Sequence, residues 1–290
     1  MGAEVIDVCV VGSANLDLVA TVDRLPGPGE TVPGSSYHEY PGGKGLNQAV
    51  AVARSGASCA FVGAVGSDSA GSDLLQVLAT EGIDHRSVDV VDAPTGRALI
   101  GVSATGENSI IVVAGANASV HEPAVPTCRV VLSQLEVPSA AIEHAFASAR
   151  AAGAITVLNP APAIALPDSV LALCDIVVPN EHEVELLGGV QRLLALGARA
   201  VVVTLGANGA DLHTADGVQH VDAFPVVPVD TTAAGDTFCG ALCARLAAGD
   251  ELPVALRFAA AAGALCTTAA GAVPSIPRLD AVRRLLSDAW

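Results

Sequence analysis

Short hydrophobic runs recur along this chain, and stretches with helical spacing separate them. The runs are continuous rather than alternating and are rich in β-branched side chains, a pattern typical of strands covered on both faces. They occupy residues 6–12, 58–65, 129–136, 154–160, 174–180 and 200–206. The helical stretches between them include residues 45–56, 72–82 and 139–153. This alternation predicts an α/β fold, a doubly wound and mostly parallel sheet flanked by helices, in a single domain over residues 1–290.

Two segments interrupt this rhythm. Residues 19–40 and 88–113 alternate apolar with polar positions and contain turn sequences such as GPG and ATGEN. Alternation of this kind predicts the strands of a small separate sheet with one open face. Because the two segments interrupt the α/β chain at separate places, we expect them to form a lid over its ligand-binding end.

The composition limits the classes of partner. The chain has 290 residues, of which 51% are hydrophobic and only 15% charged, so we expect a large buried core. Its formal net charge of −16 argues against nucleic acid or an anionic membrane surface as a partner. An anionic substrate therefore requires a local positive site made of backbone N–H groups or a rare cation.

Two segments have some features of membrane or targeting signals. Residues 1–12 lack a basic region and a cleavage site, and Ile6 stands where a myristoylation signal has Ser or Thr. Residues 258–277 are uncharged but consist mainly of Ala, Gly and Thr and end in prolines, which predicts a buried helix packed on a sheet. We therefore expect a soluble protein.

The seven cysteines indicate a reducing compartment. They are odd in number, form no CxxC pair and lie almost entirely within apolar runs, where a free thiol acts as a small hydrophobic group. We expect reduced thiols in a cytoplasmic protein. The seven histidines show no metal-ligand spacing, so a structural zinc site is not expected.

Polar side chains gather directly after the predicted strands. Such groups follow the apolar runs at residues 12–17, 159–162, 179–183 and 204–209, and at Glu136. In a parallel α/β sheet, ligands bind beyond the carboxyl ends of the strands. These residues are therefore predicted to line one polar cleft.

The segment VDTTAAGDTFCGAL at residues 229–242 is the strongest single element. Ala233, Ala234 and Gly235 lead directly into an apolar helix, whose first N–H groups are left free to hold an anion. Asp236 is either an ordinary acidic residue at a helix start or a base that takes a proton from a hydroxyl attacking a phosphate. The chain has no Walker A sequence, which excludes a P-loop enzyme.

Seven motifs together resemble one family. SANLD, PGPGET, GGKGLNQA, NPAPA, PNEHE, TLGANG and DTTAAGDTF occur in the order and spacing of the ribokinase family of sugar kinases. The resemblance extends from Val8 to Pro277. It implies a large α/β domain with a β lid that serves as a homodimer contact, and transfer of the γ-phosphoryl group of ATP to the 5-hydroxyl of D-ribose. It also implies Mg²⁺ and K⁺ as cofactors.

The resemblance assigns roles to individual positions. For catalysis it implies Asp236 as general base, with Gly235, Ala234 and Ala233 as the anion hole. For the sugar it implies contacts from Asn15, Asp17, Gly42, Gly43, Lys44, Asn47, Glu136 and Asp236. For the nucleotide it implies Asn180, Glu183, Thr204, Gly206, Ala207, Gly209 and Gly235, with Glu183 also ordering magnesium through water. For a monovalent cation it implies Asp230, Thr232, Cys266, Ala269, Gly271 and Ser275.

Three positions depart from the family pattern. Ala260 stands where His or Asn often lies near the adenine, the segment 186–200 is short, which predicts a trimmed surface helix, and Leu46 replaces a more usual Ala beside Asn47. Two alternative functions remain open. One is a nucleoside kinase or another pentose kinase on the same scaffold, and the other is a non-catalytic sugar-binding regulator.

Lys44 is the only lysine in a chain that otherwise uses arginine for its cations. An exposed cation in a flexible glycine loop is the simpler interpretation. However, Gly42, Gly43 and Gly45 are predicted to let the backbone come close to a ligand and leave space for only a slim side chain, and an ammonium is more compact than a guanidinium. We therefore predict that Lys44 reaches a sugar hydroxyl or the incoming phosphate.

Overall fold

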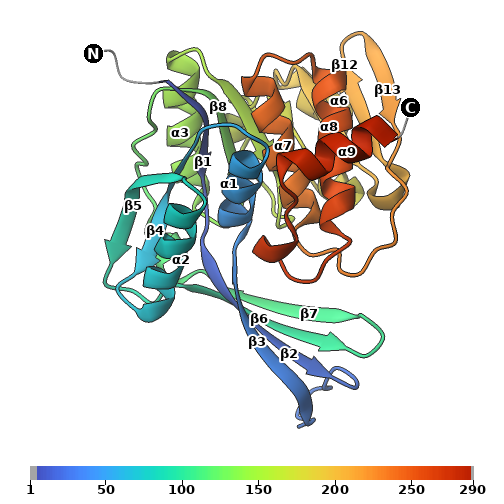
Figure 1. Ribbon diagram of the computed structural model, residues 1–290. Helices are drawn as coiled ribbons and strands as arrows, with labels where there is room; N and C mark the ends of the chain where they lie inside the picture. Colours follow the sequence, from blue (N-terminus) through green and yellow to red (C-terminus); the bar gives the residue numbers. More distant parts are fainter. Residues whose placement is uncertain (1–4, 289–290) are drawn as a thin grey trace.

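A nine-stranded sheet forms the centre of the computed structural model, which describes residues 5–288 (Figure 1). Its strands, in spatial order, are β13 (Gly217–Val221), β12 (Ala210–Thr214), β11 (Ala200–Thr204), β10 (Ile176–Val177), β9 (Ile155–Asn159), β8 (Cys128–Gln134), β1 (Ile6–Val11), β4 (Cys59–Gly66) and β5 (Asp84–Val91). The strands from β11 to β5 pair in parallel, and only β12 and β13 are antiparallel to their neighbours. The predicted fold class is confirmed.

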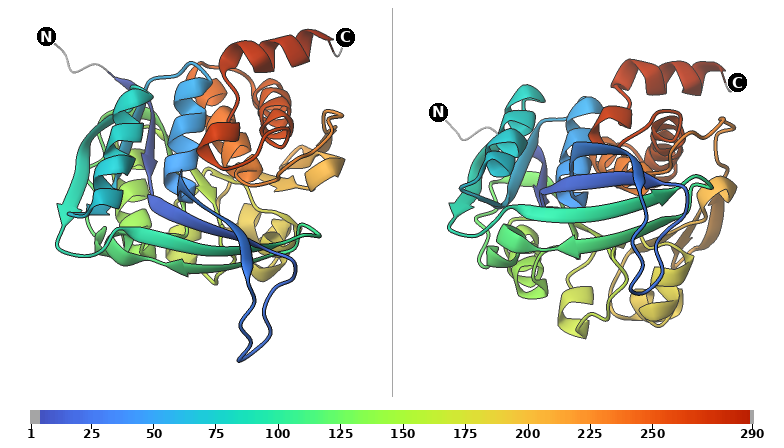
Figure 2. Two further views of the ribbon diagram at one scale, coloured as in Figure 1. Left: turned by 60° about the horizontal axis from the view of Figure 1, so that its bottom comes forward. Right: turned by 90° about the horizontal axis from the view of Figure 1, so that it is seen from below.

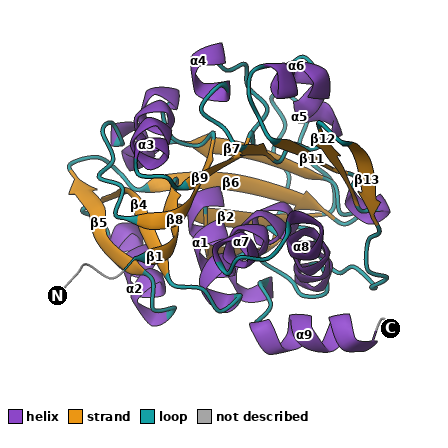
Figure 3. Cartoon of the chain, turned by 90° about the horizontal axis from the view of Figure 1, so that it is seen from above, coloured by secondary structure: helices purple, strands orange, loops and turns teal. Residues whose placement is uncertain are grey.

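Helices cover both faces of this sheet, as the view in Figure 3 shows. One face carries α1 (Lys44–Arg54), α2 (Ser69–Thr80), α7 (Ala234–Ala247) and α8 (Leu252–Cys266), with α9 (Leu279–Asp288) packed outside α8. The other face carries α3 (Ser139–Ala151), α4 (Asp168–Leu171), α5 (Glu181–Leu186) and α6 (Val190–Ala195). The short α6 is the helix of the trimmed 186–200 segment.

The two-sided core explains why the strands are continuous apolar runs. On β1, Val8 and Val10 join the core beneath α1 and α7, whereas Cys9 and Val11 join the core beneath α3. All four side chains are fully buried. Successive side chains of a strand point to opposite faces, so a strand covered on both sides is apolar at most of its positions.

A separate four-stranded sheet extends from one end of the large one, where Figure 2 shows it from below. Its order is β3 (Gly34–Gly42), β2 (Asn15–Val22), β6 (Gly96–Ser103) and β7 (Asn108–Val113). The predicted segments 19–40 and 88–113 therefore contribute, with one correction. Residues 88–91 belong to β5 at the edge of the large sheet, because their partner is the buried strand β4.

Two predicted elements end earlier than expected. The run 174–180 yields only the two-residue strand β10, because Pro179 lacks an N–H and Asn180 already caps α5. In the segment 258–277, helix α8 ends at Cys266. The rest is a loop with a short 3₁₀ turn at Val273–Ser275, since Gly271 adopts a positive φ and two prolines follow it.

The membrane and thiol predictions can be compared with residues 5–288. No helix in this range is long and apolar enough to cross a membrane. All seven cysteines are buried free thiols, as predicted. The first four residues of the N-terminal segment considered as a targeting signal lie outside the described part of the chain.

Candidate active site

The candidate site lies at the carboxyl ends of the parallel strands. The segment after β1 carries Asn15 and Asp17, and the segment after β8 carries Glu136. Helix α1 begins at Lys44 and α7 at Ala234, both at this same edge. Residues separated by more than 200 positions in the chain thus meet in one place, as parallel strands require.

Asp236 is held by two amides from helix α1. Asn47 Nδ2 donates to its Oδ2 at 3.0 Å, and Gln48 Nε2 donates to its Oδ1 at 3.1 Å. The helices approach closely because residue 240 is glycine: a Cβ there would lie 2.5 Å from the Gln48 carbonyl oxygen. Burial raises the pKa of the Asp236 carboxyl, while Lys44 and the two amide donors oppose this rise. The arrangement gives a buried carboxylate with a fixed orientation.

The start of helix α7 presents free N–H groups. Ala233 has a left-handed backbone (φ 60°), which no other non-glycine residue in the described part of the chain adopts. Among residues 5–288, the N–H groups of Ala233, Gly235 and Asp236 have no hydrogen-bond partner. Ala234 departs from the predicted set, because its N–H donates to Thr231 O at 3.3 Å. A Cβ at Gly235 would meet nothing within 4 Å, so the absence of a side chain leaves room for an anion here.

Glu136 joins the start of α1 to the segment after β1. Its Oε2 accepts hydrogen bonds from Ser13 Oγ at 2.6 Å, Asn15 Nδ2 at 3.4 Å and the Lys44 N–H at 3.1 Å. Asn15 in turn accepts from Asn117 Nδ2 at 2.7 Å. A carboxylate at a helix N-terminus is favourable electrostatically, so Glu136 stabilises the position of α1. Its Oε1 makes no hydrogen bond to any residue in the described range.

Lys44 is half-buried rather than free in solvent, which argues against the simpler interpretation of an exposed loop cation. Burial lowers the pKa of its ammonium, but the carboxylates of Asp236, Glu136 and Glu183 raise it further, so that the net shift is upward. The lysine is therefore charged and faces acidic groups from three different elements. It provides the local positive charge that an anionic substrate needs in a chain with a net charge of −16.

The glycines around Lys44 make room for a different group from the ligand that was predicted. A Cβ at Gly43 would lie 2.7 Å from the Asn15 nitrogen, and one at Gly45 would lie 2.5 Å from the Ser13 nitrogen. At Gly42 it would lie 2.1 Å from Asp17 Oδ2. The glycines thus allow this loop to contact the segment after β1, so their small size serves an approach within the chain itself.

Asp17 is a buried carboxyl whose position depends on this approach. Burial, together with the nearby carboxylates of Glu136 and Asp236, raises its pKa to about 7, and Lys44 opposes the rise. Its side chain lies beside Gly42 at the junction of the large and small sheets. A carboxyl that is only partly ionised near neutral pH can accept hydrogen bonds from, or donate one to, a polyol.

Gly42→Ala is expected to raise the KM for sugar by about 10- to 100-fold, the effect of losing one hydrogen bond to a charged group. The new methyl group displaces the Asp17 carboxylate, whereas the predicted nucleotide residues Thr204, Gly206 and Gly209 are untouched, so the KM for ATP stays close to the wild-type value. Gly34→Ala is the matched control at the other end of β3, where a Cβ would lie 3.4 Å from its nearest neighbour. An unchanged sugar KM, with only a lower melting temperature, would reduce Gly42 to a packing role.

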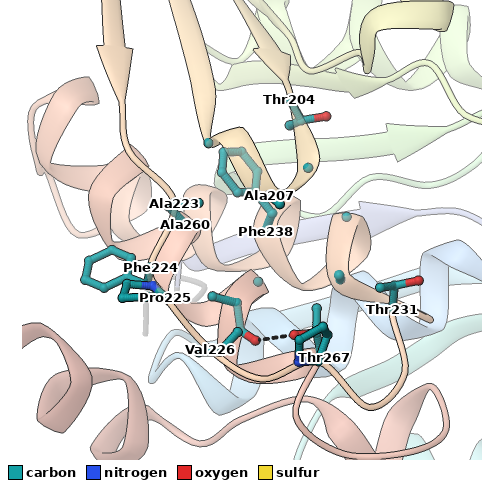
Figure 4. Close-up of a pocket in the computed structure, with 17 residues that line it drawn as sticks. Thr204, Ala207, Ala223, Phe224, Pro225, Val226, Thr231, Phe238, Ala260 and Thr267 are labelled. Carbon is teal, nitrogen blue, oxygen red and sulfur yellow. Dashed lines mark hydrogen bonds between the residues drawn. The ribbon is translucent and has the colours of Figure 1, made fainter.

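A pocket of about 410 Å³ lies beside the start of α7 (Figure 4). It contains Thr204, Gly206, Ala207 and Gly209 of the predicted nucleotide set, and Ala234 and Gly235 of the predicted anion hole. Ala260 also lines it, together with the apolar side chains of Phe224 and Phe238 (Figure 4). An apolar cavity that opens onto free N–H groups suits a flat ring attached to phosphates.

Asn180 and Glu183 do not line this pocket, although Asn180 neighbours one residue that does. Asn180 Oδ1 accepts from the Glu183 N–H at 2.8 Å, and Glu183 Oε2 accepts from the Asn180 N–H at 2.9 Å, which is a capping box at the start of α5. A bridge joins Asn180 to Thr204 of the pocket wall. Burial raises the pKa of Glu183, against the effect of the Asn180 N–H and Lys44. Both side chains therefore have a structural role whatever they bind.

Most residues of the predicted cation loop meet one another. Asp230 accepts hydrogen bonds from the Thr232 N–H at 2.9 Å, from its hydroxyl at 2.7 Å and from the Gly271 N–H at 2.9 Å. Burial raises the pKa of Asp230, but these three bonds outweigh it and hold the pKa below its usual value. Cys266 Sγ lies 3.1 Å from Ser275 Oγ and 3.6 Å from the Thr232 carbonyl oxygen. Ala269 lies exposed in the same loop.

Four residues of the site had no individual role predicted from the sequence. Gln48 and Asn117 were missed, whereas Ser13 and Asn159 lie in the ranges 12–17 and 159–162 that were predicted to line the cleft. Ser13 donates to Glu136, Asn117 donates to Asn15, and Gln48 donates to both Asp236 and Asn159. Gln48 carries a usable signal, because it is an amide within a run of Ala and Val in a predicted buried helix. Asn117 carries none, since its segment has the composition of an ordinary loop.

The comparisons place the chain in a family. It belongs to the carbohydrate kinases of the pfkB family, whose pattern matches residues 5–279. It is 40% identical over 300 residues to the ribokinase of Staphylococcus aureus, covering 96% of this chain and 99% of that protein.

Solved structures agree with this relationship. The ribokinase of Thermotoga maritima matches with a TM-score of 0.90 and 35% identity, covering 97% of this chain and 99% of that one. The ribokinase of Arabidopsis thaliana, complexed with ribose and ATP, matches with a TM-score of 0.89 and 32% identity, covering 98% and 99%. The resemblance stated from the seven motifs is confirmed.

Proposed function

We propose that this protein transfers the γ-phosphoryl group of ATP to the 5-hydroxyl of D-ribose. The observation that carries the proposal is the position of Asp236. Its side chain contacts Asn47 of the predicted sugar set. Its backbone N–H is one of the free N–H groups at the start of α7, beside the 410 Å³ pocket. A base between a polyol site and an anion site is the arrangement that phosphoryl transfer to a hydroxyl requires.

Different residues bind the sugar, accept the proton and stabilise the phosphoryl charge. Asp17 and Asn15 hold sugar hydroxyls, and Asp236 accepts the proton of the 5-hydroxyl as its oxygen attacks the γ-phosphorus. The free N–H groups at the start of α7 stabilise the negative charge on the transferring phosphoryl, and Lys44 adds a positive charge on the sugar side. Positioning and electrostatic stabilisation supply most of the rate enhancement in reactions of this type.

The pocket accommodates the nucleoside of ATP. Phe224, Phe238 and Ala260 provide an apolar surface for the adenine, and Gly206 and Gly209 keep the rim free of side chains. Gly209 is also required within the chain, since a Cβ there would lie 2.1 Å from the Val221 carbonyl oxygen. Ala260 offers no hydrogen bond to the base, so discrimination between purines depends on the main chain and on shape.

The residues present fit magnesium that is held through water. Glu183 Oε1 makes no hydrogen bond within the described range, and Mg²⁺ commonly keeps several waters while it binds one or two carboxylates and the substrate phosphates. When bound, the ion neutralises phosphate charge that would otherwise face a strongly acidic protein. The loop of Asp230 and Ser275 offers a carboxylate and main-chain carbonyls, which suit a hard monovalent cation such as K⁺.

Activity is expected to be higher in potassium than in sodium or lithium. The ion would order the loop that leads into Ala233 and so fix the N–H groups that meet the phosphate. Turnover should be measured in potassium-free buffer, with tetramethylammonium chloride to keep the ionic strength constant. Equal turnover in all four salts would contradict this assignment.

A homodimer through the small sheet and a cytoplasmic location complete the proposal. Strand β7 exposes Ile110, Ile111, Val112 and Val113 to between 47% and 63% of their possible surface, an apolar edge that suits pairing with a second copy. Seven unpaired thiols suit a reducing compartment. Light scattering of wild type and of Ile111→Lys tests the dimer, and the variant should be monomeric.

A substrate panel tests the function. Purified protein with ATP and Mg²⁺ should phosphorylate ribose in strong preference to adenosine, and the product should be the 5-phosphate by NMR. Preference for adenosine would instead favour a nucleoside kinase. Sugar binding without turnover, under conditions in which a known kinase is active, would favour a regulator.

A further inference from the structure

Gln48 is a fully buried amide on helix α1, in a sequence otherwise rich in Ala and Val. Its Nε2 donates one hydrogen bond to Asp236 Oδ1 and another to Asn159 Oδ1, each at 3.1 Å. Burying an amide among apolar side chains is unfavourable unless its groups are hydrogen-bonded. Both donor hydrogens of Gln48 are used in this way, and one of them serves the candidate base, whereas its Oε1 is buried without a hydrogen-bond partner among the described residues.

A main-chain carbonyl group determines which atom donates and which accepts in each of these hydrogen bonds. Asn159 Nδ2 donates to the Val178 carbonyl oxygen at 3.0 Å, just beyond strand β10. A carbonyl oxygen can only accept, so the Asn159 amide has one possible orientation and turns its own oxygen toward Gln48. Gln48 must then present its NH₂ group to both Asn159 and Asp236. The hydrogen bonds that run from Val178 through Asn159 and Gln48 to Asp236 therefore allow only one orientation of each amide.

We propose that Gln48 and Asn159 are positioning residues for phosphoryl transfer, which lock the Asp236 carboxylate in the orientation that accepts the hydroxyl proton. This inference rests on the proposed role of Asp236 as general base. Asn47 holds the other carboxylate oxygen at 3.0 Å, so the two oxygens are restrained from consecutive residues of one helix. Rotation of the carboxylate would break at least one of the two bonds.

Other charged or titratable groups also face Asp236. They are Lys44 of α1, Glu136 after β8, Glu183 of α5, Asp17 of β2, Cys239 of α7 and Cys266 of α8. A substitution at Gln48 leaves all of them in place. Its effect therefore reports the loss of the amide that joins the carboxylate to Asn159.

The test is Gln48→Met, which keeps the length of the side chain and removes the donor. We expect kcat to fall by about 10- to 100-fold, the effect of one hydrogen bond to a charged group. The KM values for ribose and ATP should stay within about twofold, because Asp236 is the one member of the two candidate binding sets to which Gln48 donates a hydrogen bond, and Asp236 itself stays in place. The acidic limb of the pH profile of kcat should move to higher pH, since a carboxylate that loses a donor binds a proton more readily.

Gln134→Met is the matched control, because Gln134 is also fully buried and its amide contacts Val11 rather than Asp236. It should keep the wild-type kcat and pH profile. Gln48→Glu keeps the shape of Gln48 and adds a second carboxyl beside Asp236, so the acidic limb should move further upward than in Gln48→Met. Should Gln48→Met not fold, Gln48→Glu carries the test.

A wild-type kcat and pH profile in the folded Gln48 variants would overturn the inference, as would an equal loss of kcat in Gln134→Met. Failure of the proposed function is a different result, because the wild-type protein would then not phosphorylate ribose at all.

Discussion

Asp236→Asn is expected to lose most of its turnover, by about 10² to 10⁴-fold, while the protein remains folded. The substituted amide cannot accept the proton of the attacking hydroxyl, although it has the same size as the carboxyl group. Binding of ribose should weaken less than turnover, because the contacts of Asp17 and Asn15 remain. Single-turnover phosphorylation and calorimetric binding of ribose measure the two effects separately.

One local cost accompanies this substitution. Asn47 and Gln48 both donate to Asp236, so an amide at this position turns its own NH₂ group toward one of them. Such a clash of donors costs about 1–3 kcal/mol, against which the removal of a buried charge is favourable. Asp250→Asn, beyond the other end of α7, is the control and should keep full turnover. If Asp236→Asn kept more than about a tenth of wild-type turnover, its assignment as the base would be wrong.

The large sheet could be predicted from the sequence because its strands are covered on both sides. Continuous apolar runs such as residues 6–12 have no competing interpretation when helical stretches alternate with them. The edge strand β5 was harder, since one of its sides is open and its sequence, DHRSVDVV, alternates like a strand of the small sheet. Its pairing with β4 places it in the large sheet, and the sequence of a single segment does not reveal which strand it pairs with.

The candidate site was predictable where motifs specify it and less so where packing does. Gly235 could be predicted as a site residue because a helix start of small residues has a direct physical use, whereas the role of Asp236 as base came from the family resemblance. Gln48 and Asn117 were missed because their roles depend on which side chains the fold brings beside them. The glycines near Lys44 were identified correctly as sites of close approach, but the approaching group is the chain's own backbone and Asp17.

The role of Lys44 depends on both the sequence and the structure. The sequence shows that it is the only lysine, and the structure shows which groups surround it. Carboxyl groups of Asp236, Glu136 and Glu183 all raise its pKa, so it is the counter-charge for an acidic site. Lys44→Met is expected to lower kcat/KM for ribose by about 10² to 10³-fold, the usual effect of removing one group that stabilises charge in a transition state.

The same substitution should change the pH dependence. Lys44 opposes the rise in pKa of both Asp236 and Asp17, so its removal raises both values. The base is then protonated up to a higher pH, and the acidic limb of the kcat/KM profile moves upward. Arg86→Met removes a positive charge from an exposed site and should leave the profile unchanged.

Lys44→Arg separates charge from shape. A guanidinium keeps the positive charge, but it is a wide planar group, whereas an ammonium is compact. The lysine is half-buried and faces the carboxylates of Asp236, Glu136 and Glu183, so a wider group must fit among them. We expect ribose turnover to fall at least tenfold in Lys44→Arg with little change in melting temperature, and ribose with nucleotide to protect this single lysine from an amine-selective reagent. Wild-type ribose kinetics in Lys44→Arg, or labelling that neither ligand affects, would show that the compact shape of the lysine has no part in catalysis.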